Sequence, residues 1–251
     1  MKIERTISKL NELRFYGMAN QIEAFLDDPS MQPDSWQDAI GVLVDAEEHD
    51  RQQRRQQRLL SQAKVRFSEA CIEKIVYPSA RKLKKKQIAS LANCDWISHA
   101  QNLIIVGTTG TGKSWLASAF AIQAIRKGYV VLYKRLLRLF EVLEGARMDG
   151  SLPRIRKGLA KADLLILDDW GLAPMTPESR LALLEVIEDQ TGCGSIIVTS
   201  QLPVSQWHEY IGESTIADAI LDRLVHRAHF IEPKGPSLRE TLKLNEELSH
   251  E

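Results

Sequence analysis

The sequence predicts an α/β protein in which helices cover both faces of a parallel sheet, preceded by a small all-helical N-terminal domain. From about residue 100 onward, short apolar runs alternate with segments of helical periodicity. The first 70 residues carry helical periodicity and no strand pattern. A glycine-rich loop directly follows the first apolar run. We therefore expect a helical domain over residues 1–70 and a sheet-containing domain over residues 71–251.

The N-terminal domain is predicted to hold two helical parts. Apolar residues recur at helical spacing up to Gly17, which is expected to break the run before Met18–Leu26 resumes it. After a loop that contains two prolines, Asp34 or Ser35 is placed to cap a long helix that begins near Trp36.

Alternating strands and helices are predicted after this region. The predicted strands are Leu103–Val106, Tyr129–Tyr133, Leu164–Leu167, Ser195–Thr199 and His229–Glu232. The predicted helices between them are Lys113–Lys127, Leu136–Gly145, Glu178–Thr191 and a stretch around Thr215–Arg227. Apolar strands joined by helices indicate a parallel sheet that is buried on both faces.

The composition is that of an ordinary globular chain, with 44% hydrophobic and 26% charged residues. The three cysteines, Cys71, Cys94 and Cys193, are widely spaced and form no metal-binding pattern, which suits a reducing compartment. The N-terminus lacks the apolar segment of a signal peptide, and no apolar stretch approaches the ~18 residues of a membrane span. We expect a cytoplasmic protein without membrane contact.

Positive charge is concentrated between Arg51 and Lys86, although the formal net charge of the chain is zero. Only Glu69 and Glu73 oppose the basic residues there. Such an excess favours a nucleic-acid partner, while a solvated helix face is the alternative. The candidate DNA-binding residues are Arg51, Arg54, Arg55, Arg58, Lys64, Arg66, Lys82, Lys84, Lys85 and Lys86.

The string G-T-T-G-T-G-K-S matches the phosphate-binding loop G-x-x-x-x-G-K-[ST], between a predicted strand and a predicted helix. Its backbone N–H groups and the helix N-terminus suit a phosphate chain, with Lys113 reaching the β- and γ-phosphates and Ser114 reaching Mg²⁺. A glycine-rich turn without a ligand is the alternative. The candidate nucleotide-binding residues are Gly107, Thr108, Thr109, Gly110, Thr111, Gly112, Lys113, Ser114 and Trp115.

A second string, L-L-I-L-D-D, is an apolar strand that ends in two carboxylates. Asp168 is the candidate Mg²⁺ carboxylate, together with Ser114, and Asp169 is the candidate that orients or deprotonates the attacking water. Capping at the strand end is the alternative for either carboxylate. Glu is more usual than Asp at the second position, and the shorter side chain would place the water differently.

Three further segments hold candidate phosphate contacts. Thr199, Ser200 or Gln201 could hydrogen-bond the γ-phosphate or the water, with turn chemistry at the strand end as the alternative. Arg223 could form a surface ion pair with Asp222 or a neighbouring residue, or act on the nucleotide of an adjacent subunit. Arg239 could reach the phosphates of its own subunit, and Trp96, just before the first strand, could pack against adenine.

Taken together, these motifs resemble the IstB/DnaC branch of the AAA+ ATPases and are most similar to IstB, the ATP-binding helper of insertion-sequence transposases. The segments L-N-E-L-R-F-Y-G-M-A and Q-W-H-E-Y-I-G-E-S-T-I-A-D-A-I-L-D-R-L-V-H carry the likeness beyond the ATP motifs. The resemblance implies a P-loop AAA+ core with five parallel strands in the order 5-1-4-3-2 and a short C-terminal lid. It implies sensor 1 at Gln201, the arginine finger at Arg223 and sensor 2 at Arg239.

The resemblance also implies a function. Such a protein would use ATP and Mg²⁺, form homo-oligomers when ATP is bound, bind double-stranded DNA without strong sequence preference, and deliver bent target DNA to a partner transposase. The N-terminal domain would contact DNA and transposase. A helicase loader of the DnaC type is the main alternative. A DNA-binding architectural protein with a degenerate nucleotide site is a third reading, which intact Lys113, Ser114 and Asp168 disfavour.

Overall fold

The computed structural model describes residues 3–238, and the chain divides between Arg58 and Leu59 into two compact units. The first unit contains α1 (Ile3–Glu12), α2 (Tyr16–Asp27), the short 3-10 helix η1 (Pro29–Met31) and most of α3 (Trp36–Ala63). Ser35 caps α3, because its hydroxyl accepts the Asp38 N–H and donates to the Asp38 carboxylate. No described helix is long and apolar enough to cross a membrane.

The break between α1 and α2 lies at Arg14, whose φ of 63° is left-handed, and not at Gly17 as the sequence predicted. Gly17 lies in the first turn of α2. A side chain does not fit there, because a Cβ would be 2.3 Å from the Ala46 carbonyl oxygen of α3. Beside it, the buried Glu47 carboxylate accepts the Gly17 N–H at 2.9 Å and pairs with Arg51 at 2.6 Å. Close backbone contact, which sequence periodicity does not report, is therefore the reason for this glycine.

The second unit is built on one parallel sheet. Its strands are β1 (Asn102–Val106), β2 (Val131–Arg135), β3 (Leu164–Trp170), β4 (Ser195–Ser200) and β5 (Ala228–Ile231). They lie in the order β2-β3-β4-β1-β5, and every adjacent pair is parallel. This is the predicted five-stranded parallel sheet, read from its other edge.

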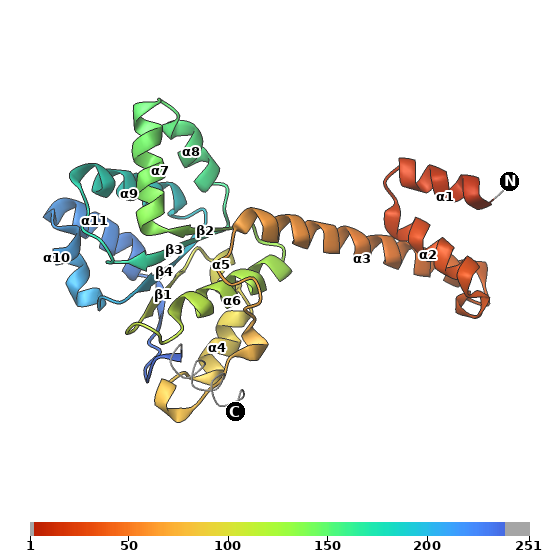
Figure 1. The fold of residues 1–251 in the computed structure, drawn as a ribbon, viewed down its shortest axis with the longest axis horizontal. Helices are drawn as coiled ribbons and strands as arrows, with labels where there is room; N and C mark the ends of the chain where they lie inside the picture. Colours follow the sequence, from red (N-terminus) through yellow and green to blue (C-terminus); the bar gives the residue numbers. More distant parts are fainter. Residues whose placement is uncertain (1–2, 239–251) are drawn as a thin grey trace, which may run out of the picture. The chain divides into compact units, whose positions relative to one another are not determined.

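Helices cover both faces of this sheet (Figure 1). One face carries α4 (Lys85–Ala92), α5 (Asp95–Ser98) and α6 (Lys113–Arg126), after the 3-10 turns η2 (Ile72–Lys74) and η3 (Ser79–Arg81). The other carries α7 (Leu136–Met148), α8 (Leu152–Leu159), α9 (Pro177–Gln190), α10 (Trp207–Ile211) and α11 (Ser214–Val225), with η4 (Val204–Gln206) leading into α10. The sequence interpretation did not assign α8.

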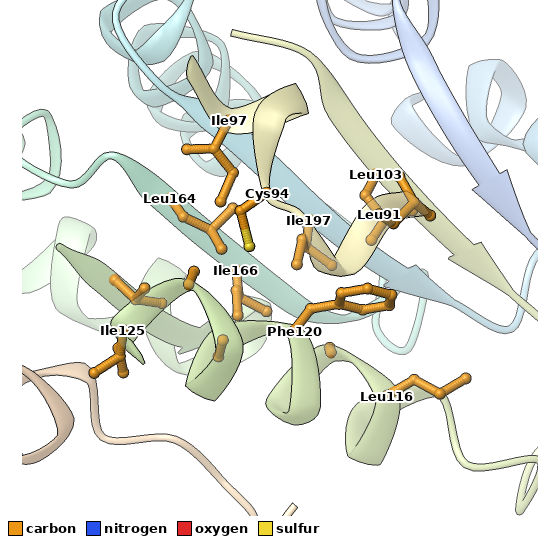
Figure 2. Packing of buried hydrophobic residues seen from close by; sticks show 14 of the residues in the cluster. Leu91, Cys94, Ile97, Leu103, Leu116, Phe120, Ile125, Leu164, Ile166 and Ile197 are labelled. Carbon is orange, nitrogen blue, oxygen red and sulfur yellow. The ribbon is translucent and has the colours of Figure 1, made fainter. Parts of the chain in front are cut away.

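The core forms two apolar layers because successive side chains of a strand point to opposite faces. In β3, Leu164 and Ile166 join the layer beneath α6, whereas Leu165 and Leu167 join the layer beneath α7 and α9. Figure 2 shows the first layer, with Phe120 of α6 packed toward the strands. The layers are continuous up to the carboxyl ends of the strands, where polar residues begin.

Two strands, β2 and β3, differ from their predicted ranges by more than one residue. Tyr129 precedes β2 because its N–H completes the end of α6 by bonding to the Ala124 carbonyl oxygen. β3 continues past Leu167 to include both aspartates and Trp170. The sequence predicted a strand that ends at the carboxylates, with its range stopping at Leu167, whereas both carboxylates lie within the strand.

Candidate active site

The glycine-rich loop joins β1 to α6 at the carboxyl end of the sheet, and three of its glycines are required by geometry. Gly110 and Gly112 have φ of 82° and 86°, in the left-handed region. A Cβ on Gly107 would lie 2.6 Å from the Pro233 carbonyl oxygen. Among the described residues no side chain caps the N-terminus of α6, and the positive end of the helix dipole there favours an anion.

Lys113 and Ser114, the first two residues of α6, both turn toward the loop and the carboxylates. The Lys113 ammonium donates to the Thr108 carbonyl oxygen at 2.8 Å, within the loop itself. The Ser114 hydroxyl donates to Asp168 at 2.8 Å. The residues that the sequence placed on the phosphates and on the metal are therefore brought together.

The Asp168 carboxylate is the centre of a buried hydrogen-bond network, and its side chain is 0% exposed. Besides Ser114, it accepts from the Tyr133 hydroxyl at 2.6 Å, from the Thr199 hydroxyl, and from Arg66 at 3.1 Å. Burial and the neighbouring Asp168 charge raise the pKa of Tyr133, so the phenol remains a proton donor. Asp168 is thus held in one orientation from four sides.

Asp169 reaches the same place through an irregular backbone. Consecutive strand residues normally face opposite sides of a sheet. Asp169 has a φ of 66°, and the pairing of β3 with β4 shifts register between Leu167 and Trp170. As a result Arg66 contacts both carboxylates, at 3.1 Å to Asp168 and 3.5 Å to Asp169. Asp169 keeps 21% exposure and lines the cavity beside the loop.

Thr199 links the two aspartates and does not face the cavity. Its hydroxyl donates to Asp168 and accepts the Asp169 N–H at 3.1 Å. Ser200 performs the turn chemistry considered as the alternative, since its hydroxyl bonds to Trp170 and Leu202 backbone atoms. Of the three polar candidates at this strand end, Gln201 alone lines the cavity, where its side chain accepts from the Thr109 hydroxyl at 2.7 Å.

Three residues of the site were missed by the sequence interpretation. It grouped Arg66 with the DNA-binding cations, but the guanidinium pairs with Asp168 and Asp169. Tyr133 was assigned only to a strand, and Arg135, which donates to Asp169 at 3.1 Å, was not singled out. Because Arg135 pairs in register with Asp168 across β2 and β3, strand adjacency could have identified it. No sequence signal identifies Arg66.

An apolar extension of the cavity lies beyond the loop. Its apolar lining residues are Phe67, Ile75, Val76, Trp115 and Leu238. Arg81, only 5% exposed, ties this wall to the loop by donating to the Val76 and Thr111 carbonyl oxygens, both at 3.0 Å. The predicted adenine contact of Trp96 is wrong, because its indole is buried in the core and donates to the Leu91 carbonyl oxygen.

Arg223, the candidate arginine finger, is not among the described residues that line this cavity. Arg223 pairs at 2.9 Å with Glu188 of α9, a neighbouring residue and not Asp222. Its other nitrogen donates to the Ala219 carbonyl oxygen. Arg239 lies outside the described residues.

The remaining DNA-binding candidates are exposed. Arg51 and Arg54 lie over the rings of Phe15 and Tyr16 and pair with Glu47 and Asp50 in the first unit. The other exposed candidates are Arg55, Arg58, Lys64, Lys82, Lys84, Lys85 and Lys86. Lys85 and Lys86 begin α4, where positive charge is unfavourable next to the positive end of the helix dipole unless an anion is nearby.

A phosphate-binding loop at the end of β1, facing acidic β3 in a sheet of order β2-β3-β4-β1-β5, defines a P-loop ATPase of the AAA+ class. The sequence matches the model of the IstB-like ATP binding protein family over residues 8–246. The chain belongs to this family and is an ATP-binding ATPase.

Curated relatives extend over nearly the whole chain. An insertion sequence ATP-binding protein of Sinorhizobium fredii, y4pL, is 44% identical over 234 residues, which cover 93% of this chain and 95% of the relative. The ATP-binding protein of insertion sequence IS1162 from Pseudomonas fluorescens is 44% identical over 205 residues, covering 82% and 89%.

Solved structures support the fold. The DnaC helicase loader superimposes with a TM-score of 0.53 at 16% identity, covering 66% of this chain and 97% of the loader. AMPPCP-bound DnaA from Aquifex aeolicus gives 0.56 at 17% identity, covering 71% of this chain and 55% of DnaA. At such low identity these similarities concern the fold alone.

Proposed function

We propose that this ATPase binds duplex DNA without strong sequence preference, oligomerises on it when ATP is bound, remodels it, and delivers it to a partner transposase. The observation that carries this proposal is the family relationship with insertion sequence ATP-binding proteins. The intact loop and carboxylate pair add an ATP-dependent element, and the basic stretch between Arg51 and Lys86 adds a polyanion-binding element.

The nucleotide would lie along the cavity. The residues from Gly107 to Trp115 would hold the phosphates through backbone N–H groups and the Lys113 ammonium. The apolar wall, with Phe67, Val76 and Leu238, suits the adenine ring, and Trp115 closes this wall at the start of α6.

Magnesium fits the residues present. The ion prefers oxygen ligands and needs only one or two carboxylates when the substrate supplies phosphate oxygens. The Ser114 hydroxyl and the Asp168 carboxylate already lie 2.8 Å apart, and the described residues contain no larger acidic cluster that would form a separate protein cage. These two would hold the ion, which when bound neutralises charge on the β- and γ-phosphates.

The protein's own groups then divide the catalytic work. Asp169, partly exposed at the cavity, would orient or deprotonate the attacking water, and Gln201 would contact the γ-phosphate or that water. Arg223 would leave Glu188 and stabilise transition-state charge in a neighbouring subunit. Arg239 is proposed for the phosphates of its own subunit. Lys113 would hold the transferred phosphoryl group.

DNA binding would come from many weak contacts. The candidate cations would contact phosphates, so affinity should fall with salt and depend little on sequence. Residues 1–70 are proposed to contact both DNA and transposase. Bending a site of 20–30 base pairs costs of order 1–6 kcal/mol, which contacts distributed along an oligomer could offset. Hydrolysis would weaken the subunit interface and release the DNA.

Comparison of the wild type with Lys113→Ala tests whether ATP controls assembly on DNA. The wild type should form a larger complex on a random-sequence duplex with ATP than without, as measured by light scattering after size exclusion. Lys113→Ala should lose the ATP-dependent increase. A Lys113→Ala variant that assembles fully without ATP dependence would support the architectural reading. A preference for single strands would support a helicase loader.

A further inference from the structure

A cationic groove lies beside the active site in the second unit, at the edge strand of the sheet. Its lining residues come from β2, from α7 and α8, which follow β2 in the chain, and from the segment just after α3. Figure 1 shows the positions of β2, α7 and α8 in the fold. Among the described residues that line it, six are basic and none is acidic. The basic lining residues are Lys64, Arg66, Lys134, Arg135, Arg138 and Arg154.

Aliphatic side chains also line this β2–α7–α8 groove. They include Leu132, Val142 and Ile155, and the Val142 side chain is exposed although it is apolar. A lining of cationic and aliphatic side chains matches a nucleic-acid backbone, which presents phosphates and, between them, sugar carbons.

The charges in the groove repel one another. Burial and the nearby Lys64 charge lower the pKa of Lys134, so its ammonium is disfavoured where it stands. Within the described part of the chain, Arg138 pairs with the exposed Glu141, and such a surface pair is weak. A polyanion in the groove would relieve this repulsion and replace the weak pair.

Two of the six cations belong to the groove and to the active site at once. Arg135 donates to Asp169 at 3.1 Å, and Arg66 contacts Asp168 and Asp169 at 3.1 and 3.5 Å. Neither is locked in the core, because the side chains of Arg66 and Arg135 are 31% and 48% exposed. Each side chain is therefore exposed enough to contact either the active-site aspartates or a phosphate bound in the groove.

We propose that the β2–α7–α8 groove binds the phosphate backbone of DNA, and that Arg66 and Arg135 couple this binding to occupancy of the nucleotide site. The inference rests on the proposed function, and it assigns DNA contact to residues outside the basic stretch between Arg51 and Lys86. A metal held at Asp168 would compete with Arg66 for that carboxylate, and a water held by Asp169 would compete with Arg135, so an occupied nucleotide site would release both arginines to the groove. Coupling is reciprocal, so DNA in the groove strengthens nucleotide binding equally.

Two charge-matched double variants of the full-length protein test the groove. Arg138→Glu with Arg154→Glu changes two exposed groove residues that contact neither aspartate. Lys157→Glu with Lys161→Glu makes the same change of charge at exposed positions just after Arg154 that do not line the groove. The probe is a fluorescent duplex of random sequence, followed by anisotropy over a salt series with and without a non-hydrolysable ATP analogue.

The groove variant should bind the duplex about tenfold more weakly, and its salt slope should fall by about two phosphate contacts. Its affinity for the analogue in the absence of DNA should equal that of the wild type. The Lys157/Lys161 variant should stay within about twofold of wild-type DNA affinity, since exposed charges away from the path are largely screened. If both variants lost the same amount of duplex affinity, the loss would be an effect of net charge, and the proposal that DNA binds in the groove would be overturned.

The coupling needs its own variant. Arg135→Gln should shrink the ratio between DNA affinities measured with and without the analogue, because one of the two shared cations no longer moves between the sites. An unchanged ratio would overturn the coupling. Wild-type protein that binds no duplex would overturn the proposed function and this inference together. Duplex binding that the groove variant retains in full would overturn this inference alone.

Discussion

The Ser114 hydroxyl donates a 2.8 Å hydrogen bond to the Asp168 carboxylate, joining the phosphate-binding loop to the acidic strand. The loop that leads to Ser114 follows β1, whereas Asp168 lies in β3, and these two strands are not neighbours because β4 lies between them. The contact is therefore made over the carboxyl end of β4, which supplies Thr199 to the same carboxylate. This three-strand junction is the basis of the following predictions.

Removal of the Asp168 charge should separate nucleotide binding from its dependence on metal. Asp168→Asn should bind ATP without the gain in affinity that Mg²⁺ gives the wild type, since one of the two proposed metal ligands is neutral. Turnover should fall at least about 100-fold, within the range seen when transition-state charge stabilisation is lost. Calorimetric titration with and without Mg²⁺ measures the first effect, and Glu69→Gln, an exposed carboxylate, is the control.

Thr199→Val should lower turnover with little effect on KM. The substitution keeps the shape but removes the hydroxyl that fixes Asp168 and accepts the Asp169 N–H. An unsatisfied buried group costs about 1–3 kcal/mol, so the free energy of unfolding should fall by that order. Thr191→Val removes a hydroxyl that bonds to the Ile187 carbonyl oxygen away from the site, and should leave turnover unchanged. Equal turnover in both variants would show that the Thr199 hydroxyl does not position the aspartates for catalysis.

Asp169→Asn should keep ATP binding and assembly on DNA while slowing release. The amide can still fill the space of the carboxylate but cannot act as a base, so hydrolysis would no longer weaken the interface. Stopped-flow dissociation of labelled duplex after ATP binding measures the release rate. Loss of ATP binding itself would show that Asp169 is a structural residue or a metal ligand.

Arg223→Ala should lower turnover of the assembled protein and weaken assembly, while a single subunit keeps its nucleotide affinity. Glu188→Ala is the matched control because it breaks the same ion pair from the other side. Such a partly exposed pair is worth at most about 1 kcal/mol of stability. If both variants lose turnover equally, the ion pair and not an action on a neighbouring nucleotide explains the effect.

Cysteine labelling should report on the core beneath α5. Burial raises the pKa of the Cys94 thiol to about 11, whereas Cys193 is exposed. Because the thiolate is the reactive form, iodoacetamide at pH 8 should label Cys193 rapidly and Cys94 only when the fold opens. Mass spectrometry of a labelling time course measures both rates, and rapid labelling of Cys94 in the native protein would contradict its placement in the core.

The sheet and the phosphate-binding loop were predictable because their signals are local. A buried parallel strand is a continuous apolar run, and the loop has a fixed glycine pattern next to it. Gln201 was predicted as one of three neighbouring candidates, and it is the one that lines the cavity. The Thr199 hydroxyl bonds to Asp168, and the Ser200 hydroxyl makes turn hydrogen bonds.

What the sequence did not predict depends on contacts between distant residues. Arg66 is 102 positions from Asp168, and its charge resembles that of its exposed neighbours. Trp96 lies near the first strand in sequence, but its indole turns into the core. Gly17 resembles a helix breaker, although the close approach of α3 is what requires it. Propensity and spacing do not contain such information.

The most direct test of the central claim is an anisotropy comparison of duplex and single-stranded DNA, with ATP, with ADP and without nucleotide, at two salt concentrations. We predict tight binding to duplex that requires ATP, weakens as salt rises, and is indifferent to sequence. Preference for single strands, or duplex binding that nucleotide does not change, would contradict an ATP-controlled DNA-delivery function.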